Sequence, residues 1–304
     1  MIDLIYIVAP IFLIILLGKL LRKSLILSDD IWHQINKLTY WLLFPALLFN
    51  KTSIIDFSGY SLGAFSLSMM AGFLVSVFCA WLLSRLYGMD APALSSVIQG
   101  SGRHNSFLAL AVISQFLGEQ GEIIGALAVA IMVTFSNILT IIFMIMILSG
   151  HNGSKPSILS EIIRNPFIVS IAIGLVFNVL GWGNLPILHD FTSNLGTAAL
   201  PLALICVGAG LRFVGGSKHI IPSLIATLTK MIILPATVYA CALYFQLDPI
   251  MTACAVIFAS VPTSSTAYAL AKTMGGDAPL MAAIISLQTL VSIVTVPLVM
   301  HIVG

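Results

Sequence analysis

The chain has 304 residues, of which 59% are hydrophobic and 8% are charged, and its formal net charge at pH 7 is +2. Its mean hydropathy of +1.10 is far above that of a soluble domain. This value excludes a water-soluble enzyme or binding module and predicts an integral membrane protein. We therefore expect membrane lipids around the chain and no nucleic-acid partner.

Ten apolar segments along the chain are long enough to cross a bilayer. A helix needs about 20 apolar residues to cross a hydrocarbon layer roughly 30 Å thick. The first apolar run begins at Leu4 without a basic region or a cleavage site, so we interpret it as a spanning helix and not as a signal peptide. The prediction is an all-α integral membrane protein with ten transmembrane helices, near residues 3–22, 31–50, 60–87, 91–116, 121–150, 163–181, 187–213, 219–246, 249–273 and 277–302.

The basic residues fall mostly on one side of the membrane when these segments are threaded in order. By the positive-inside rule this side is cytoplasmic, so both termini face outward, and the short loops indicate a bacterial inner membrane. The side with the loops after segments 1, 3, 5, 7 and 9 carries Lys19, Arg22, Lys23, Arg85, Lys155, Arg164, Arg212, Lys218 and Lys272. The other side carries Lys51 with Asp3, Asp56, Glu119, Glu122, Asp190 and Asp248.

The two halves of the chain are related. At offsets of 156 and 157 residues, prolines and glycines coincide in matching positions of matching segments. The pairs are Pro10 with Pro166, Gly18 with Gly174, Pro45 with Pro201, Pro92 with Pro249 and Gly118 with Gly275. Because five is an odd number, a second five-helix unit enters the membrane from the opposite side. We therefore predict two inverted five-helix repeats, residues 1–150 and 151–304, which is an arrangement typical of transporters.

The fourth and ninth segments are predicted to be interrupted in the middle of the membrane. Asn105 and Pro262 align in the repeat, and each is the fourteenth residue of its segment. Pro262 cannot donate a backbone hydrogen bond, and Gly100 and Gly102 are expected to loosen the backbone of segment 4. Broken backbone persists at this depth only where it faces protein or a wet cavity, so the two breaks predict a binding site.

The ionisable residues at this depth are basic, and no acidic residue falls in the middle of a segment. Half-helices that begin after the breaks direct positive dipole ends to the centre, where an anion is the preferred ligand. The expected substrate-binding residues are Asn105, Arg103, His104, Ser106, Pro262, Thr263, Ser264, Ser265, Asn137, Lys230 and Gln288, with Thr266 beside them.

Several of these residues also have purely structural interpretations. Arg103 either attracts a substrate carboxylate or is satisfied by carbonyl groups at the helix break. His104 is either a proton-coupling switch or a neutral side chain bonded to backbone. Lys230 either faces the pathway or extends toward the membrane interface. Asn137 and Gln288 either line the scaffold side of the site or only bond between helices.

Nothing in the sequence indicates catalytic or metal chemistry. The four cysteines lie in apolar runs without metal-ligand spacing, and we interpret them as small core residues. The chain contains no H-E-x-x-H motif, no paired aspartates at the depth of the membrane and no phosphate-binding loop of the G-x-x-x-x-G-K type. We therefore expect neither an enzyme nor a cofactor or metal site.

The sequence resembles the auxin efflux carrier family, which includes plant auxin exporters and bacterial carriers of malate, malonate and similar acids. The matching motifs are "FPALLF" from Phe44 to Phe49, "NSFLALAV" from Asn105, and the run from Pro262 to Lys272 followed by Gly275 to Asp277. They occur in the family's order along the whole chain. Plant members usually have proline where this chain has His104, and the bacterial G-L-P-L-like continuation is replaced by residues 108–111.

The resemblance implies a bile-acid symporter or antiporter-like architecture in which a scaffold domain and a transport domain interleave from both repeats. It also implies crossing broken helices 4 and 9, elevator-type alternating access, contact between Asn105 and a substrate carboxylate, and a homodimer through the scaffold domain. The predicted function is secondary transport of small organic anions, either mono- or dicarboxylates, with auxin-like acids included. The alternative is a sodium- or proton-coupled carrier of the bile-acid symporter or antiporter type.

Overall fold

The computed structural model describes residues 2–24, 28–55, 60–148, 165–183, 185–212 and 216–304, and within these ranges the chain forms helices and no strand. Asp56, Lys155 and Arg164, which were used to predict the orientation, lie outside the described residues. The helices are α1 Ile2–Lys23, α2 Asp29–Leu38, α3 Phe44–Ser53, α4 Leu62–Leu86, α5 Ala91–Gly102, α6 Ser106–Ile147, α8 Pro166–Val179, α9 Pro186–Gly210, α10 Ile220–Leu228, α11 Leu234–Tyr244, α12 Pro249–Ser260, α13 Thr266–Met274 and α14 Ala278–Val303. The π-helical turn η1 Thr39–Leu43 connects α2 to α3, and the π-helical turn η3 Thr229–Ile233 connects α10 to α11. A 3₁₀ turn, η2 Ser217–His219, precedes α10.

Five helical stretches among the described residues are long and apolar enough to cross a membrane. They are Leu62–Leu86, Ala91–Ile147, Pro186–Gly210, Ser217–Tyr244 and Ala278–Val303, and the apolar helices α8 and α12 are shorter. The predicted helical membrane architecture is confirmed at this level. The number of spans and the inverted repeat stay predictions.

Aspartates at the ends of the predicted segments cap helices. The Asp90 and Asp248 carboxylates accept backbone N–H groups in the first turns of α5 and α12, each over 2.9 Å, and Asp277 does the same for α14 over 2.9 Å. A carboxylate at a helix N-terminus satisfies an otherwise unpaired donor and interacts favourably with the helix dipole. These contacts explain why acidic residues recur at segment ends.

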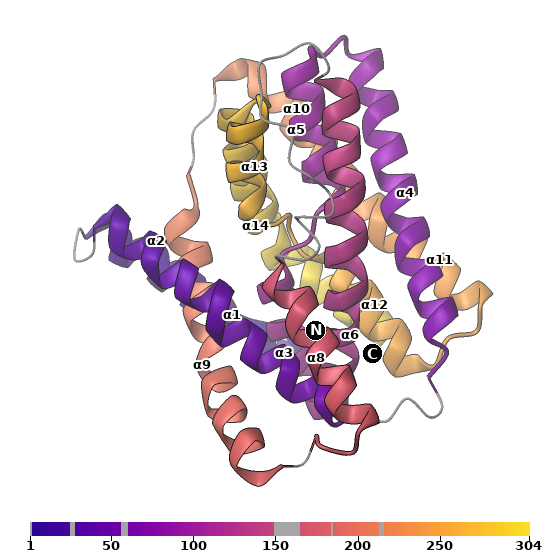
Figure 1. The fold of residues 1–304 in the computed structure, drawn as a ribbon. Coiled ribbons are helices and arrows are strands. Elements are labelled where there is room, and N and C mark those ends of the chain that lie inside the picture. The colour runs from indigo at the N-terminus through magenta and orange to yellow at the C-terminus, as the bar shows by residue number, and fades with distance from the viewer. Residues whose placement is uncertain (1, 25–27, 56–59, 149–164, 184, 213–215) are drawn as a thin grey trace.

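The helices pack in two groups (Figure 1). The first group contains α1, α2, α3, α8 and α9, and the second contains α4, α5 and α10 to α14. α6 contacts both groups, packing mainly against α12 and also touching α1, α3, α8 and α9. The two groups also touch directly where α1 contacts α14, so the boundary between them runs along α6 and past this contact.

Glycines bring the helices of the first group into backbone contact. A methyl group on Gly18 of α1 would overlap the backbone of Ile205 in α9, and one on Gly208 of α9 would overlap the backbone of Ile15 in α1. The two helices cross with their main chains touching, which only glycine permits. This reciprocal contact fixes the pair tightly.

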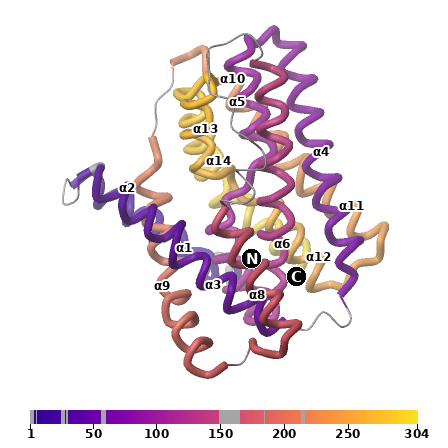
Figure 2. Tube along the Cα trace, in the orientation of Figure 1, coloured from indigo at the N-terminus to yellow at the C-terminus, as the bar shows by residue number. Residues whose placement is uncertain are grey.

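Two helices are interrupted, and their breaks lie near the middle of the molecule (Figure 2). One break separates α5 from α6 and the other separates α12 from α13. At Gly118 the φ angle is 65° and the ψ angle −154°, so residues 106–117 and 119–147 of α6 are two helices joined by a sharp reversal. Glycine adopts this positive φ without steric cost.

Candidate functional site

The two breaks touch each other. Arg103 (φ −74°, ψ 156°) and Val261 (φ −76°, ψ 154°) turn the chain from helix to extended backbone at the ends of α5 and α12. The Asn105 N–H donates to the Pro262 carbonyl oxygen over 2.8 Å. The predicted interruption near Pro262 is therefore observed, and backbone freed by one break is partly satisfied by the other.

Gln288 of α14 binds both sides of this crossing. Its Oε1 accepts the Thr263 N–H over 2.9 Å, and its Nε2 donates to the carbonyl oxygens of Gly100 (2.9 Å) and Ala226 (3.2 Å). The side chain is completely buried. A buried amide that satisfies three backbone groups holds α5, α10 and the segment after α12 in one arrangement.

A hydroxyl network supports the end of α5 from the other side. The Ser76 hydroxyl lies 3.0 Å from the carbonyl oxygen of Ser101 and 2.9 Å from that of Thr229, and it can donate to one of them at a time. The Thr229 hydroxyl donates to the Ser101 hydroxyl over 2.8 Å. These contacts join α4, α5 and η3 behind the crossing.

The glycines before the break serve close packing. A methyl group on Gly102 would meet the Phe73 ring, and one on Gly100 would meet the Ile284 side chain. Neither glycine is among the residues with positive φ. We had expected these glycines to loosen the backbone. The structure gives them a steric role instead, because α4 and α14 approach α5 too closely for a side chain at either position.

A cavity of about 50 Å³ adjoins the crossing, and we call it the central pocket. It has room for a few water molecules at most. None of the described residues that line it is acidic. Its polar lining residues are Arg103, His104, Ser106, Ser136, Asn137, Ser264 and Thr266, and its other lining residues are Tyr40, Phe107, Met132, Val133 and Phe167.

Arg103 provides the formal positive charge of the central pocket. Its side chain is only 8% exposed, and one guanidinium nitrogen donates to Asn137 Oδ1 over 2.9 Å and to the Thr266 hydroxyl over 3.0 Å. The Ser264 hydroxyl lies 2.9 Å from the Thr266 hydroxyl. Arg103 thus joins the break in the first helix to the start of α13. A planar guanidinium held in this way can receive a carboxylate in two parallel hydrogen bonds.

His104 and Asn105 have different surroundings although they are adjacent. The His104 ring lies 5.2 Å from the Phe258 ring, and its buried Nδ1 has no hydrogen-bond partner among the described residues. The Asn105 side chain does not line the central pocket, since its Oδ1 caps α6 by accepting the Leu108 N–H over 3.1 Å. The structure thus places His104 at the pocket and Asn105 beneath it.

The other expected site residues fall into two sets. Ser106, Asn137 and Ser264 line the central pocket with Arg103 and His104. Pro262, Thr263, Gln288 and Lys230 are buried away from its wall, and Ser265 lines a neighbouring cavity. Hydropathy predicted the depth of these polar residues in the membrane but not the direction in which they point.

Sequence reasoning missed an aromatic cluster that closes the central pocket. The Tyr40 and Phe167 rings lie 4.8 Å apart, and the Phe44 ring lies 4.6 Å from that of Phe107 and 4.8 Å from that of Phe167. These residues come from η1, α3, α6 and α8, so they connect the first group to α6. Phe44 is the first residue of the "FPALLF" run, and this run is the one motif in the sequence analysis that includes a residue of the aromatic cluster.

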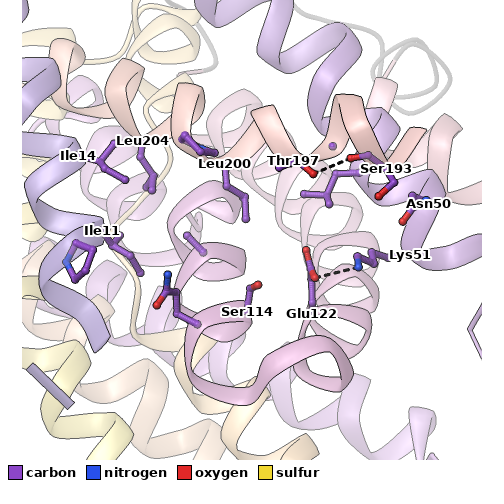
Figure 3. Close-up of a pocket in the computed structure, with 16 residues that line it drawn as sticks. Ile11, Ile14, Asn50, Lys51, Ser114, Glu122, Ser193, Thr197, Leu200 and Leu204 are labelled. Atoms are coloured by element: carbon purple, nitrogen blue, oxygen red, sulfur yellow. Dashed lines mark hydrogen bonds and ion pairs between the residues drawn. The ribbon is translucent and has the colours of Figure 1, made fainter. Parts of the chain in front are cut away.

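Two larger cavities lie along the boundary between the groups. One, of about 340 Å³, is lined by residues of α1, α3, α6 and α9, and we call it the Lys51 pocket (Figure 3). Within it, Lys51 of α3 forms an ion pair with Glu122 of α6 at 3.1 Å. The other, of about 330 Å³, is lined by Arg22, Arg212, Tyr268 and neighbours, and we call it the Arg212 pocket. Thr266 lines both the Arg212 pocket and the central pocket.

Comparison with known proteins identifies the class. Residues 153–300 match a family described as "Membrane transport protein". The match indicates that the chain is a membrane transporter. The match confirms the resemblance found in the sequence, and it confirms that the chain is a transporter and not an enzyme.

Two relatives are similar to the transporter over nearly its full length. A protein of Methanothermobacter thermautotrophicus named "Uncharacterized transporter" is 25% identical over an alignment of 296 residues, gaps included, that covers 96% of this chain and 95% of the relative. A protein of Rhizobium meliloti named "Putative malonate transporter" is 25% identical over an alignment of 306 residues, gaps included, that covers 95% of this chain and 92% of the relative. The similarity thus includes both breaks and the central pocket.

Proposed function

We propose that the transporter is a secondary carrier of small organic anions, with mono- and dicarboxylates as the substrate class. The observation that carries the proposal is Arg103, a buried cation in the wall of a pocket where two broken helices cross. Its guanidinium is held at the pocket by Asn137 and Thr266, and a planar guanidinium held in this way can receive a carboxylate in two parallel hydrogen bonds. A substrate carboxylate would bind to it there.

The hydroxyl groups beside Arg103 suit the same ligand. Ser106, Ser264 and Thr266 can donate hydrogen bonds, and Ser106 and Thr266 begin the half-helices α6 and α13. Helix N-termini favour negative charge. The name of the Rhizobium relative makes malonate the first acid to test.

The proposed architecture is a pair of inverted five-helix repeats, residues 1–150 and 151–304. Its support is that α5 and α12 start alike, with a capping aspartate and a proline in the first turn, and change to extended backbone at Arg103 and Val261. Both termini would face outward across a bacterial inner membrane.

The proposed mechanism is alternating access by an elevator movement. The second helix group, which carries both breaks, would move against the glycine-fixed first group, which would also form a homodimer. The central pocket is too small for a dicarboxylate, so the walls contributed by Tyr40 and Phe167 must separate from Arg103 to admit one. The larger cavities on the boundary are the proposed access routes.

Counterflow in proteoliposomes tests this function. Vesicles loaded with unlabelled malonate should take up labelled malonate without ATP, and other mono- and dicarboxylates inside should replace malonate as the driving acid. Malonamide, which has the same skeleton without charge, should not. If no acid drives uptake, the anion-carrier proposal is wrong. Uptake that requires a sodium or proton gradient would support the cation-coupled alternative instead.

A further inference from the structure

The Arg212 pocket has the chemistry of an anion site of its own. Arg22 and Arg212 line it together with His33, and no acidic side chain is among the described residues of its wall. At about 330 Å³ it is far larger than the central pocket and can hold a small dicarboxylate. Two arginines facing one cavity raise the local concentration of anions.

The two arginines are held in place by different contacts. The Arg22 guanidinium donates to the carbonyl oxygen of Ala209 at the end of α9 over 2.6 Å. The Arg212 guanidinium lies 5.9 Å from the centre of the Tyr268 ring, and its backbone exchanges hydrogen bonds of 3.0 and 2.9 Å with the Ser286 hydroxyl. The Arg212 side chain itself is exposed, so its charge is available to a ligand.

An unsatisfied donor in the same wall points to a ligand. Trp32 is 8% exposed, and its buried indole N–H has no hydrogen-bond partner among the described residues. A buried donor without an acceptor is unfavourable, and buried donors are rarely left unpaired in folded proteins. An anion bound between Trp32 and the arginines would bring an acceptor to this wall.

The Arg212 pocket also adjoins the site of the proposed function. Thr266 lines both cavities, and the Thr266 hydroxyl accepts a hydrogen bond from Arg103 over 3.0 Å. An acid in the Arg212 pocket therefore has only the start of α13 between it and Arg103.

We propose that the Arg212 pocket is a second anion-binding site, which receives the carboxylate of the transported acid before it reaches Arg103. The inference rests on the proposed function for the identity of the ligand. The chemistry is that of a carboxylate or phosphate group, so an anionic lipid headgroup is the competing source of the ligand.

The test uses Trp32 as a reporter in the full-length protein. Trp41, Trp81 and Trp182 are replaced by phenylalanine, and the fluorescence of Trp32 is titrated with malonate in detergent and in neutral phosphatidylcholine nanodiscs. We expect a saturable change whose Kd rises about tenfold in Arg212→Gln, because one charge-assisted hydrogen bond is lost. Since Arg212 binds Ser286 through its backbone, this variant should keep its fold.

Two further variants separate this site from the others. Arg103→Gln should keep the Trp32 titration, with a Kd changed much less than in Arg212→Gln, because Arg103 does not line the Arg212 pocket and reaches it only through Thr266. Arg85→Gln removes an exposed charge at the end of α4 that lines none of the three cavities, and it should also have no effect.

Four results would overturn the proposal. They are a flat titration, a Kd that Arg212→Gln does not change, a signal lost in Arg103→Gln, and a response to phosphatidylglycerol nanodiscs but not to malonate. A flat titration with active malonate counterflow would reject this site and leave the proposed function standing. Conversely, the protein could show no counterflow while its Trp32 titration depends on Arg212. This result would support the anion site in the Arg212 pocket and reject the proposed carrier function.

Discussion

At the scale of single residues, Lys230 is the polar group whose burial is hardest to explain by structure alone. It is completely buried in η3, and its Nζ has no hydrogen-bond partner among the described residues. It lies within electrostatic range of His104. A group that is this costly to bury and does not bond its neighbours is a candidate for retention by function.

We predict that Lys230→Met stabilises the folded protein and slows transport. Methionine has a similar length and fills the same space without an amine to desolvate, so the expected gain is about 1–3 kcal/mol. Thermal unfolding in detergent and malonate counterflow measure the two effects. Lys218→Met, at an exposed position of η2, is the matched control and should change neither. A lower unfolding temperature for Lys230→Met would show that the amine is needed for stability.

The residue scale also shows what sequence can predict about a membrane site. Arg103 and His104 stood out because charge is rare in an apolar segment, and both line the central pocket. Tyr40, Phe107 and Phe167 could not stand out, because aromatic residues are ordinary in such a sequence. Lys230 was assigned to the site by its depth, and Asn105 by its place at the helix break and by the resemblance. The helix rotation that decides which way a side chain points is set by packing.

At the scale of elements, the crossing depends on Gln288. We predict that Gln288→Leu destabilises the protein by about 2–4 kcal/mol, because it leaves the Thr263 N–H and two buried carbonyl oxygens without partners. Gln288→Glu keeps the acceptor for Thr263 but loses both donors, so it should not restore stability. Gln120→Leu, on the exposed face of α6, is the control. Equal unfolding temperatures for Gln288→Leu and Gln120→Leu would contradict the claim that Gln288 stabilises the crossing of the two breaks.

The contact between α1 and α9 gives a second prediction for elements. Gly208→Ala should destabilise the protein by about 1–3 kcal/mol, because its methyl group would overlap the backbone of Ile15. Gly210→Ala lies in the same helix where nothing is within 4 Å of the added methyl group, so it should be neutral. Thermal unfolding of the two variants compares them directly. If both behave alike, the first group is not fixed by this crossing.

Element positions were predictable for a simple physical reason. The apolar length needed to cross a bilayer and the proline at position 262 act locally, so the helices lie close to the predicted segments and the break at Pro262 lies where it was expected. The turn at Gly118 was not predicted. The division into two groups was not predictable from hydropathy, because lipid-facing and protein-facing surfaces are equally apolar. Resemblance alone suggested a scaffold and a transport domain, and that assignment stays a prediction.

At the scale of the whole molecule, the two groups meet along α6 and where α1 contacts α14, and buried polar groups gather where both broken helices reach this boundary. The Lys51–Glu122 ion pair joins α3 to α6 in one boundary cavity, and the arginines line the other. The central pocket lies between the aromatic cluster and Arg103. This arrangement suits a carrier in which one helix group moves an anion past the other.

The most direct test of this account is malonate counterflow in proteoliposomes for wild type, Arg103→Gln and Arg85→Gln. Loss of one buried charge-assisted contact to the substrate is worth about 1.5–3 kcal/mol, so Arg103→Gln should lower the uptake rate at low malonate by at least about tenfold. Arg85→Gln, which removes an exposed charge, should match wild type. Wild-type counterflow by a correctly folded Arg103→Gln would contradict the claim that the carboxylate is bound where the two broken helices cross.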